Sequence, residues 1–205
     1  MEELVRSLKN SGVLKTAQLV EAFLKADRKN FVPENLKDLA YLDEALPIGE
    51  GQTISQPYTV AFMLELLEPQ SGQTLMDVGY GSGWTTALLA QIVGDAGRVY
   101  AFERVRELCD FGEKNVSKYP DLRKRIIFNC RDASAGVPGQ KFGGIIAAAE
   151  VSEVPGAWRE QLKPGGRLVY PKGGAVFKEV KKGENNFMVE KYPGFVFVPF
   201  IKDAD

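Results

Sequence analysis

Residues 74–84 read TLMDVGYGSGW, and they predict a buried strand that runs into a glycine-rich turn and then a helix. The apolar first half is typical of an internal strand, and residues 87–92 follow with the apolar spacing of a helix. Gly79, Gly81 and Gly83 allow the backbone to turn sharply and to approach a ligand closely. The first amides of the helix present a positive end to an anion. We therefore expect this unit to hold a nucleotide-type cofactor.

Two acids near the turn indicate which cofactor it holds. Asp77 precedes the first glycine, and its carboxylate suits a cofactor that carries an ammonium group. Residues 98–102 predict the next strand, and Glu103 at its end can accept both hydroxyls of a ribose. A dinucleotide fingerprint would place its third glycine where this chain has Trp84. A glycine-rich turn alone also serves as a plain strand–helix connection. With both acids, the pattern resembles motif I of the class I S-adenosylmethionine methyltransferases.

The composition is that of an ordinary globular protein. The 205 residues are 44% hydrophobic and 26% charged, and we expect one methyltransferase domain, with N-terminal helices and a substrate loop in residues 1–60 and a Rossmann-like core in residues 61–205. The net charge of -1 and the pI near 5.8 give no basic surface for nucleic acid. No apolar run of about 18 residues predicts a membrane span. The acidic, amphipathic start is unlike a signal peptide, so we expect a cytoplasmic protein.

Absent and rare residue types limit the chemistry. The sequence has no histidine, which removes the commonest general base and the commonest zinc ligand, and we expect no bound metal. The two cysteines are isolated, Cys109 in an expected helix and Cys130 in an expected strand. We expect both to be reduced packing residues rather than a disulfide or a metal pair.

The order of the expected elements specifies the fold class. Helical spacing covers residues 2–9 and 15–26. Residues 38–48 are expected to be irregular or short extended chain, and a polar loop then leads to a helix that begins near Pro57. Beyond residue 78, the expected strands are 98–102, 125–130, 144–149 and 167–171, the expected helices are 104–118 and 155–162, and the expected strands of the tail are 175–180, 187–191 and 195–200. We therefore predict an α/β fold with a doubly wound, mostly parallel, Rossmann-like sheet, N-terminal helices and antiparallel C-terminal strands.

Further segments resemble one family of methyltransferases. They are residues 31–33 with 40–43, 51–57 (GQTISQP), 161–169 and 197–200. Together with residues 74–84 they make the chain similar to the protein-L-isoaspartate (D-aspartate) O-methyltransferases. GQTISQP is the most specific segment, because class I methyltransferases in general lack it.

The resemblance implies a repair reaction. A methyl group passes from S-adenosyl-L-methionine, leaving S-adenosyl-L-homocysteine, to the α-carboxyl of L-isoaspartyl or D-aspartyl residues in damaged peptides and proteins. The methyl ester then cyclises to a succinimide that can reopen to aspartate. A carboxylate is already an anionic nucleophile at neutral pH and a sulfonium is an activated methyl donor. The reaction therefore needs no general base, which suits a chain without histidine. We expect a monomer.

The resemblance also implies roles for individual residues. Ser55 is the implied catalytic residue, which holds the isoaspartyl carboxylate beside the methyl group. The implied cofactor-binding residues are Thr53, Ile54, Ser55, Asp77, Gly79, Gly81, Gly83, Glu103, Asp132 and Ala133, the last two beside the adenine. The implied substrate-binding residues are Ser55, Tyr41, Tyr58 and Phe197, the aromatic ones as walls of a peptide groove.

Several of these residues also have a plain structural interpretation. Ser55 lies just before Gln56 and Pro57 and could serve only as a helix N-cap. Asp132 could equally be a turn residue or a helix cap. Trp84 is expected to be a packing residue, and aromatic residues at the places of the groove walls are more often in the core.

The chain also departs from the family pattern. Residues 131–133 read Arg-Asp-Ala where the family usually has Gly-Asp-Gly, Gly143 and Gly144 replace an acid, and the segment after Phe200 is short. These changes leave room for a carboxyl methyltransferase with another peptide acceptor. A non-catalytic cofactor-binding module is a further alternative, against which the intact residues 53–55 argue. Trp84 argues against a nicotinamide oxidoreductase.

Overall fold

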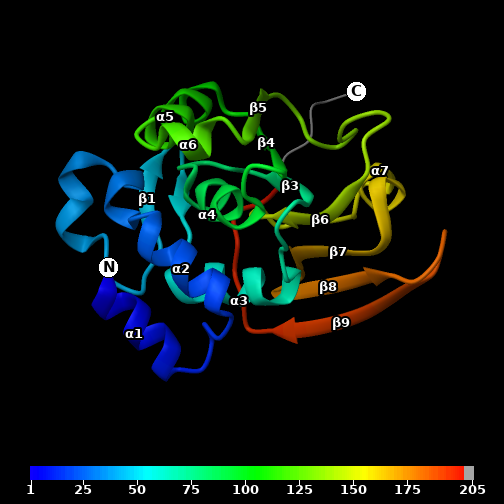
Figure 1. The fold of residues 1–205 in the computed structure, drawn as a ribbon, viewed down its shortest axis with the longest axis horizontal. Coiled ribbons are helices and arrows are strands. Elements are labelled where there is room, and N and C mark those ends of the chain that lie inside the picture. The colour runs from blue at the N-terminus through cyan, green and yellow to red at the C-terminus, as the bar shows by residue number, and fades with distance from the viewer. Residues whose placement is uncertain (201–205) are drawn as a thin grey trace.

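The fold is organised around one sheet, which Figure 1 shows running through the middle of the molecule. The computed structural model describes residues 1–200, and these form a seven-stranded sheet in the order β5-β4-β3-β6-β7-β8-β9. Its parallel strands are β3 (Thr74–Val78), β4 (Arg98–Glu103), β5 (Ile126–Cys130), β6 (Phe142–Ala147) and β7 (Leu162–Lys172), and β8 (Ala175–Lys181) and β9 (Phe187–Pro193) are antiparallel additions. The predicted fold class is confirmed.

Helices cover the sheet, and a small hairpin precedes it. The helices are α1 (Glu2–Asn10), α2 (Ala17–Lys25), α3 (Pro57–Leu67), α4 (Trp84–Val93), α5 (Arg106–Val116), α6 (Pro120–Arg123) and α7 (Gly156–Gln161), with 3-10 helices η1 (Arg28–Phe31) and η2 (Glu34–Leu39). Strands β1 (Leu46–Gly49) and β2 (Gln52–Ile54) form the hairpin. Figure 1 shows α1 and α2 on the same side of the molecule as this hairpin. The first two helices and the start of α3 at Pro57 lie where the sequence predicts them.

The core lies on both faces of the sheet. Leu75 and Met76 are neighbours in β3 and are fully buried, yet they belong to different clusters of buried side chains. Side chains alternate between the two faces of a strand, so each face of β3 is covered. The first cluster includes side chains of α1 to α5, and the second includes Trp158 of α7. This double coverage explains why the central strands read as continuous apolar runs.

The glycine-rich turn lies at the point where the strand order reverses. From β3 the chain adds β4 and β5 on one side and then returns to β6 on the other, which creates a crevice at the carboxyl end of β3. Gly79, Gly81 and Gly83 have φ angles of 80°, 46° and 83°, which residues with a Cβ rarely adopt. A Cβ on Gly83 would also lie 2.9 Å from the carbonyl oxygen of Gly112 in α5. This last glycine therefore permits close packing of α5.

Trp84 packs the N-terminal segment against the turn. Its side chain is 1% exposed and its Nε1 donates to the carbonyl oxygen of Ala26 at 2.9 Å. The ring of Phe23 meets it edge-on, with centroids 5.3 Å apart. The prediction that Trp84 is a packing residue is confirmed.

The strand predicted for residues 195–200 is wrong. Within the described chain this segment pairs with the rest of the protein through one isolated bridge, between Glu150 and Pro199. The two hydrogen bonds of this bridge run from the Glu150 amide to the Val198 carbonyl and from the Phe200 amide to the Glu150 carbonyl, both 2.7 Å. Of its aromatic residues, Phe197 and Phe200 line a cavity instead, and Phe195 stacks on Phe62 with centroids 5.0 Å apart. The short end of the chain after Phe200 lies outside the described residues.

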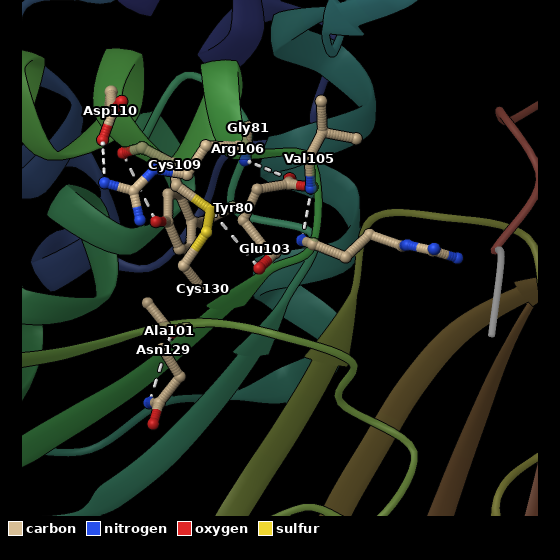
Figure 2. Close-up of a disulfide and its surroundings, with 11 residues drawn as sticks. Tyr80, Gly81, Ala101, Glu103, Val105, Arg106, Cys109, Asp110, Asn129 and Cys130 are labelled. Carbon is tan, nitrogen blue, oxygen red and sulfur yellow. Dashed lines mark hydrogen bonds and ion pairs between the residues drawn. A yellow bond between two sulfur atoms is a disulfide. The ribbon is translucent and has the colours of Figure 1, made fainter. Parts of the chain in front are cut away.

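The two cysteines form a disulfide, which joins α5 to the end of β5 (Figure 2). Cys109 and Cys130 are 21 positions apart in sequence, but their Cα atoms are 5.8 Å apart. The prediction of two reduced packing cysteines is therefore wrong. It considered each cysteine within its own element, whereas the packing of α5 on β5 brings the two together.

None of the helices in residues 1–200 combines the length and apolar character needed to cross a membrane. Among the same residues, no three His, Cys, Asp or Glu side chains gather as ligands for a metal ion.

Candidate active site

A cavity of about 580 Å³ opens at the carboxyl ends of the central strands. The turn after β3, the end of β4, the loop after β5, the hairpin β1–β2 and the C-terminal segment surround it. The lining residues that the sequence predicted are Thr53, Ile54, Ser55, Gly79, Gly81, Glu103, Asp132, Ala133 and Phe197. Segments far apart in the sequence therefore meet around one hollow, as the strand order requires.

Glu103 holds the shape of the glycine turn. Its Oε2 accepts the Gly81 amide at 3.1 Å, and its Oε1 accepts the amides of Arg104 and Val105 at 2.8 and 3.0 Å. Figure 2 shows the carboxylate of Glu103 directed toward the amides of Gly81 and Val105. The side chain lines the cavity and is 9% exposed. A carboxylate in this place presents acceptor oxygens to a ligand that carries hydroxyl groups.

Asp77 lies beneath the turn instead of on the cavity wall. It is fully buried, and its Oδ2 accepts the Thr86 hydroxyl at 2.5 Å. Its Oδ1 has no hydrogen-bond partner among the described residues. Burial raises the pKa of this carboxyl to about 7, the Thr86 bond opposes the rise, and the charge of Glu103 adds to it. Asp77 therefore keeps a proton under mildly acidic conditions.

The three glycines have different positions relative to the cavity. Gly79 and Gly81 line it, and Gly83 is buried against α5 and is absent from its lining within the described chain. A Cβ on Gly81 would lie 3.2 Å from the Cδ1 of Ile48, which is itself a lining residue. The turn is thus a cradle whose space a side chain would partly fill.

Ser55 follows the hairpin and lines the cavity beside Thr53 and Ile54. The N-cap of α3 is Gln56, whose side chain makes no capping bond within the described residues. Asp43 provides a bond to this helix end instead, because its Oδ1 accepts the Tyr58 amide at 2.7 Å. The interpretation of Ser55 as the helix N-cap therefore does not describe this structure. Ser55 is half-buried and is part of the cavity wall.

The loop after β5 has both a structural and a lining role. Asp132 Oδ1 accepts the amide and the hydroxyl of Ser134, both at 2.9 Å, so Asp132 does hold a turn as the plain interpretation proposed. It also lines the cavity together with Ala133. Ala133 is 3% exposed, and its carbonyl oxygen accepts Trp158 Nε1 at 2.9 Å.

Two predicted groove residues lie elsewhere. Tyr41 is outside the cavity lining in the described chain, and its hydroxyl donates to Asp27 Oδ2 at 3.0 Å. Tyr58 lines a neighbouring cleft, which also shares Asp43, Gln56, Thr59 and Val196 with the main cavity. Of the three aromatic residues, Phe197 is the one at the main cavity.

Sequence reasoning missed several lining residues. Arg131 stands over the ring of Phe102 at 4.8 Å, and both line the cavity. Ile48, Asp43 and Glu44 also line it. The position of Phe102 directly before Glu103 was a usable signal, because side chains at the carboxyl ends of central strands face the crevice. Arg131 gave none beyond its departure from the family pattern.

The cavity fits a nucleoside that carries positive charge. It has the volume of a small-molecule site, an apolar wall that includes Phe102 and Leu108, a carboxylate at Glu103 and a glycine cradle that a Cβ would crowd. The orphaned Oδ1 of Asp77 adds an acceptor below the cradle. These features match the sulfonium nucleoside that the sequence predicts.

Comparison with known proteins gives a consistent result. The family model described as protein-L-isoaspartate(D-aspartate) O-methyltransferase (PCMT) matches residues 1–205. The protein-L-isoaspartate O-methyltransferase of Methanopyrus kandleri is 40% identical over 207 residues, which cover 98% of this chain and 90% of that protein. The enzyme of that name from Pyrococcus horikoshii is 38% identical over 203 residues, covering 96% and 90%.

Solved structures show the same fold. One from Plasmodium falciparum, assigned as a protein-L-isoaspartate O-methyltransferase and in complex with S-adenosyl-L-homocysteine, has a TM-score of 0.88 at 24% identity and covers 98% of each chain. Another protein-L-isoaspartate O-methyltransferase has a TM-score of 0.89 at 28% identity, covering 98% of this chain and 66% of that one.

Proposed function

Because the chain belongs to the protein-L-isoaspartate (D-aspartate) O-methyltransferase family, we propose that it methylates the α-carboxyl group of L-isoaspartyl residues in peptides and proteins. S-Adenosylmethionine is the cofactor. The observation that carries the proposal is that Ser55 of the GQTISQP segment lines the same cavity as Gly79, Gly81 and Glu103. A carboxylate held at Ser55 thus lies in one hollow with the cofactor cradle.

We assign cofactor binding to the residues around the glycine turn. Gly79 and Gly81 let the backbone approach the cofactor, Glu103 accepts the ribose hydroxyls, and Asp132 and Ala133 bound the adenine. Asp77 and Gly83 act from below: Asp77 through its bond to Thr86, and Gly83 by admitting α5 close to the turn. When bound, S-adenosylmethionine supplies a methyl group activated by its sulfonium charge.

The chain itself positions and desolvates the acceptor. The Ser55 hydroxyl donates to the α-carboxylate and fixes one oxygen toward the methyl group. Ile54 is 3% exposed and Phe197 is half-buried, so both limit the access of water to the carboxylate. A less hydrated carboxylate is a stronger nucleophile, and fixed alignment replaces a bimolecular encounter. These residues do not have to move a proton.

The proposal is tested with two peptides that differ only in isoaspartate or aspartate at one position. The protein is incubated with methyl-labelled S-adenosylmethionine, and base-labile methyl ester is measured. Ester on the isoaspartyl peptide alone is the expected result. Ester on neither peptide overturns the proposal, and equal ester on both replaces it with a general carboxyl methyltransferase.

Ser55→Ala is expected to lower kcat/KM for the isoaspartyl peptide by about 10- to 100-fold, because a hydrogen bond to a charged group is lost. The dissociation constant of S-adenosylmethionine, measured by calorimetry, should change much less. Thr59→Ala is the matched control, since Thr59 lines the same cavity but its hydroxyl donates to Gln56 at 3.3 Å. Full activity of Ser55→Ala would refute the role given to the hydroxyl.

Glu103→Gln is expected to raise the dissociation constant of S-adenosylmethionine by about 10- to 100-fold. The carboxamide of glutamine has one acceptor oxygen, and its NH2 group is a donor. This NH2 group therefore replaces an acceptor oxygen that now faces either a backbone amide of the turn or the ribose hydroxyls. Titration calorimetry measures the effect, and Glu107→Gln, an exposed acid in the first turn of α5, is the control. Equal affinity for both variants would contradict the assignment of Glu103.

Further features of the proposal rest on the sequence. We propose a single domain that acts as a monomer on exposed peptide segments in the cytoplasm, with neither nucleic acid nor membrane as a partner. The near-neutral net charge supports the exclusion of nucleic acid. Light scattering after size-exclusion chromatography tests the monomer, and subcellular fractionation tests the location.

A further inference from the structure

Arg28 is a buried cation outside the cavity lining, and its surroundings are unusual. The side chain is 0% exposed, and it lies in η1, far along the chain from the glycine turn. Burial lowers the pKa of Arg28 to about 10, while the charge of Asp43 opposes the fall. A buried charge is costly unless it is well bonded, so the groups that the guanidinium contacts explain why it is there.

The guanidinium binds backbone carbonyls of two separate segments. Nη1 donates to the carbonyl oxygens of Ala40 and Leu42 at 2.8 and 3.3 Å. Nη2 donates to those of Glu44 and Ser55 at 2.8 and 3.2 Å. One planar group thus connects residues 40–44 with the proposed catalytic serine. A lysine ammonium could not span these acceptors, because it is a point donor instead of a fork.

Asp43 makes a second contact between the 40–44 segment and the residues that follow Ser55. Asp43, within the segment that Arg28 holds, accepts the Tyr58 amide in the first turn of α3 at 2.7 Å. Residues 55–58 are therefore fixed at both ends, by Arg28 at the Ser55 carbonyl and by Asp43 at the Tyr58 amide. Asp43, Glu44 and Ser55 all line the cavity.

We infer that Arg28 is a positioning residue for methyl transfer, which sets the place of Ser55 and of the 40–44 segment relative to the acceptor carboxylate. The inference rests on the role proposed for Ser55. Arg28 contacts neither donor nor acceptor, and it acts through the backbone that carries Ser55. Misplacement of a reacting group by about 1 Å can cost about 100-fold in rate, so loss of this anchor should be seen in the kinetics of the peptide.

The test compares Arg28→Lys with Phe31→Leu. Phe31 is the matched control, because it belongs to the same 3-10 helix and is 0% exposed, but its ring stacks on Tyr119 with centroids 5.6 Å apart. Arg28→Lys should lower kcat/KM for the isoaspartyl peptide by about 10- to 100-fold and leave the affinity for S-adenosylmethionine within about threefold. Phe31→Leu should lower the free energy of unfolding but leave both kcat/KM for the isoaspartyl peptide and the affinity for S-adenosylmethionine unchanged. Restored turnover of Arg28→Ala on addition of ethylguanidinium, measured against ethylammonium, supports the positioning role.

Two further measurements keep the inference falsifiable. Asp43→Ala changes an exposed side chain and removes the other anchor, so it should reproduce the kinetic pattern of Arg28→Lys even if Arg28 variants fold poorly. Amide hydrogen exchange should quicken at residues 55–58 in both. If Ser55→Ala is inactive but Arg28→Lys and Asp43→Ala behave like Phe31→Leu, the positioning role is wrong and the role of Ser55 stands. If Ser55→Ala is fully active, the role of Ser55 fails and the inference fails with it.

Discussion

Asp77→Asn is expected to abolish a pH dependence of stability: the free energy of unfolding of the natural protein should fall as the pH rises from about 4 to about 7, and that of the variant should not. The Asp77 carboxyl has a pKa near 7 in the folded state, raised from 3.8 mainly by complete burial, with the Thr86 bond opposing and Glu103 adding to the shift. In that interval the folded chain holds a proton that the unfolded chain has released. Each pH unit then costs about 1.4 kcal/mol, and the whole interval costs on the order of 4 kcal/mol.

Urea unfolding at a series of pH values measures this effect. The natural protein should lose stability relative to Asp77→Asn between the two pKa values and keep a constant difference above the upper one. Asp110→Asn is the control, because Asp110 is exposed and pairs with Arg106 at 3.3 Å. Its curve should run parallel to that of the natural protein. Parallel curves for Asp77→Asn as well would show that the buried carboxyl does not titrate as described.

Asparagine is the informative replacement because it is nearly isosteric. Its carbonyl oxygen can still accept the Thr86 hydroxyl, so the helix start keeps its connection to β3. The amide group then occupies the place of an acceptor oxygen that lacks a partner among the described residues. This adds a cost that does not depend on pH. The pH dependence of the difference between the two proteins therefore isolates the charge from the hydrogen bonding.

The sequence predicted the central unit because its signals are local. A short apolar run, glycines at alternate positions and an acid at the end of the next strand each follow from backbone geometry within a few residues. The same local patterns predicted α1, α2 and the start of α3 at Pro57. Parallel pairing of the strands followed from their alternation with helices.

Features that depend on distant contacts were predicted wrongly or not at all. Alternating apolar and aromatic residues at 195–200 resemble a strand locally, but the segment meets Glu150 by one bridge and turns its side chains to the cavity. Asp77 and Gly83 belong to the motif, yet their burial places them behind the cavity wall. The anchoring of Ser55 by Arg28 spans 27 positions, and no local pattern encodes it.

Loss of the disulfide is expected to lower the free energy of unfolding by about 3 kcal/mol. Cys109 and Cys130 close a loop with a sequence separation of 21, and a cross-link across a loop of this length removes about that much conformational entropy from the unfolded chain. The variant Cys109→Ser/Cys130→Ser avoids leaving one free thiol. Urea unfolding with and without reductant compares it with the natural protein.

The reductant provides the internal control. It should bring the natural protein to the stability of the double variant and leave the variant unchanged, because Cys130 lies at an exposed strand end that a reductant can reach. Two free thiols in the native, unreduced protein, or equal stability of both forms, would contradict the link. Leu108 and Arg131 are the sequence neighbours of the two cysteines, and both line the cavity. The disulfide therefore connects two segments of the cavity lining. A weaker affinity for S-adenosylmethionine in the reduced protein would therefore mean that the link holds α5 and the loop after β5 at the separation that the cofactor requires.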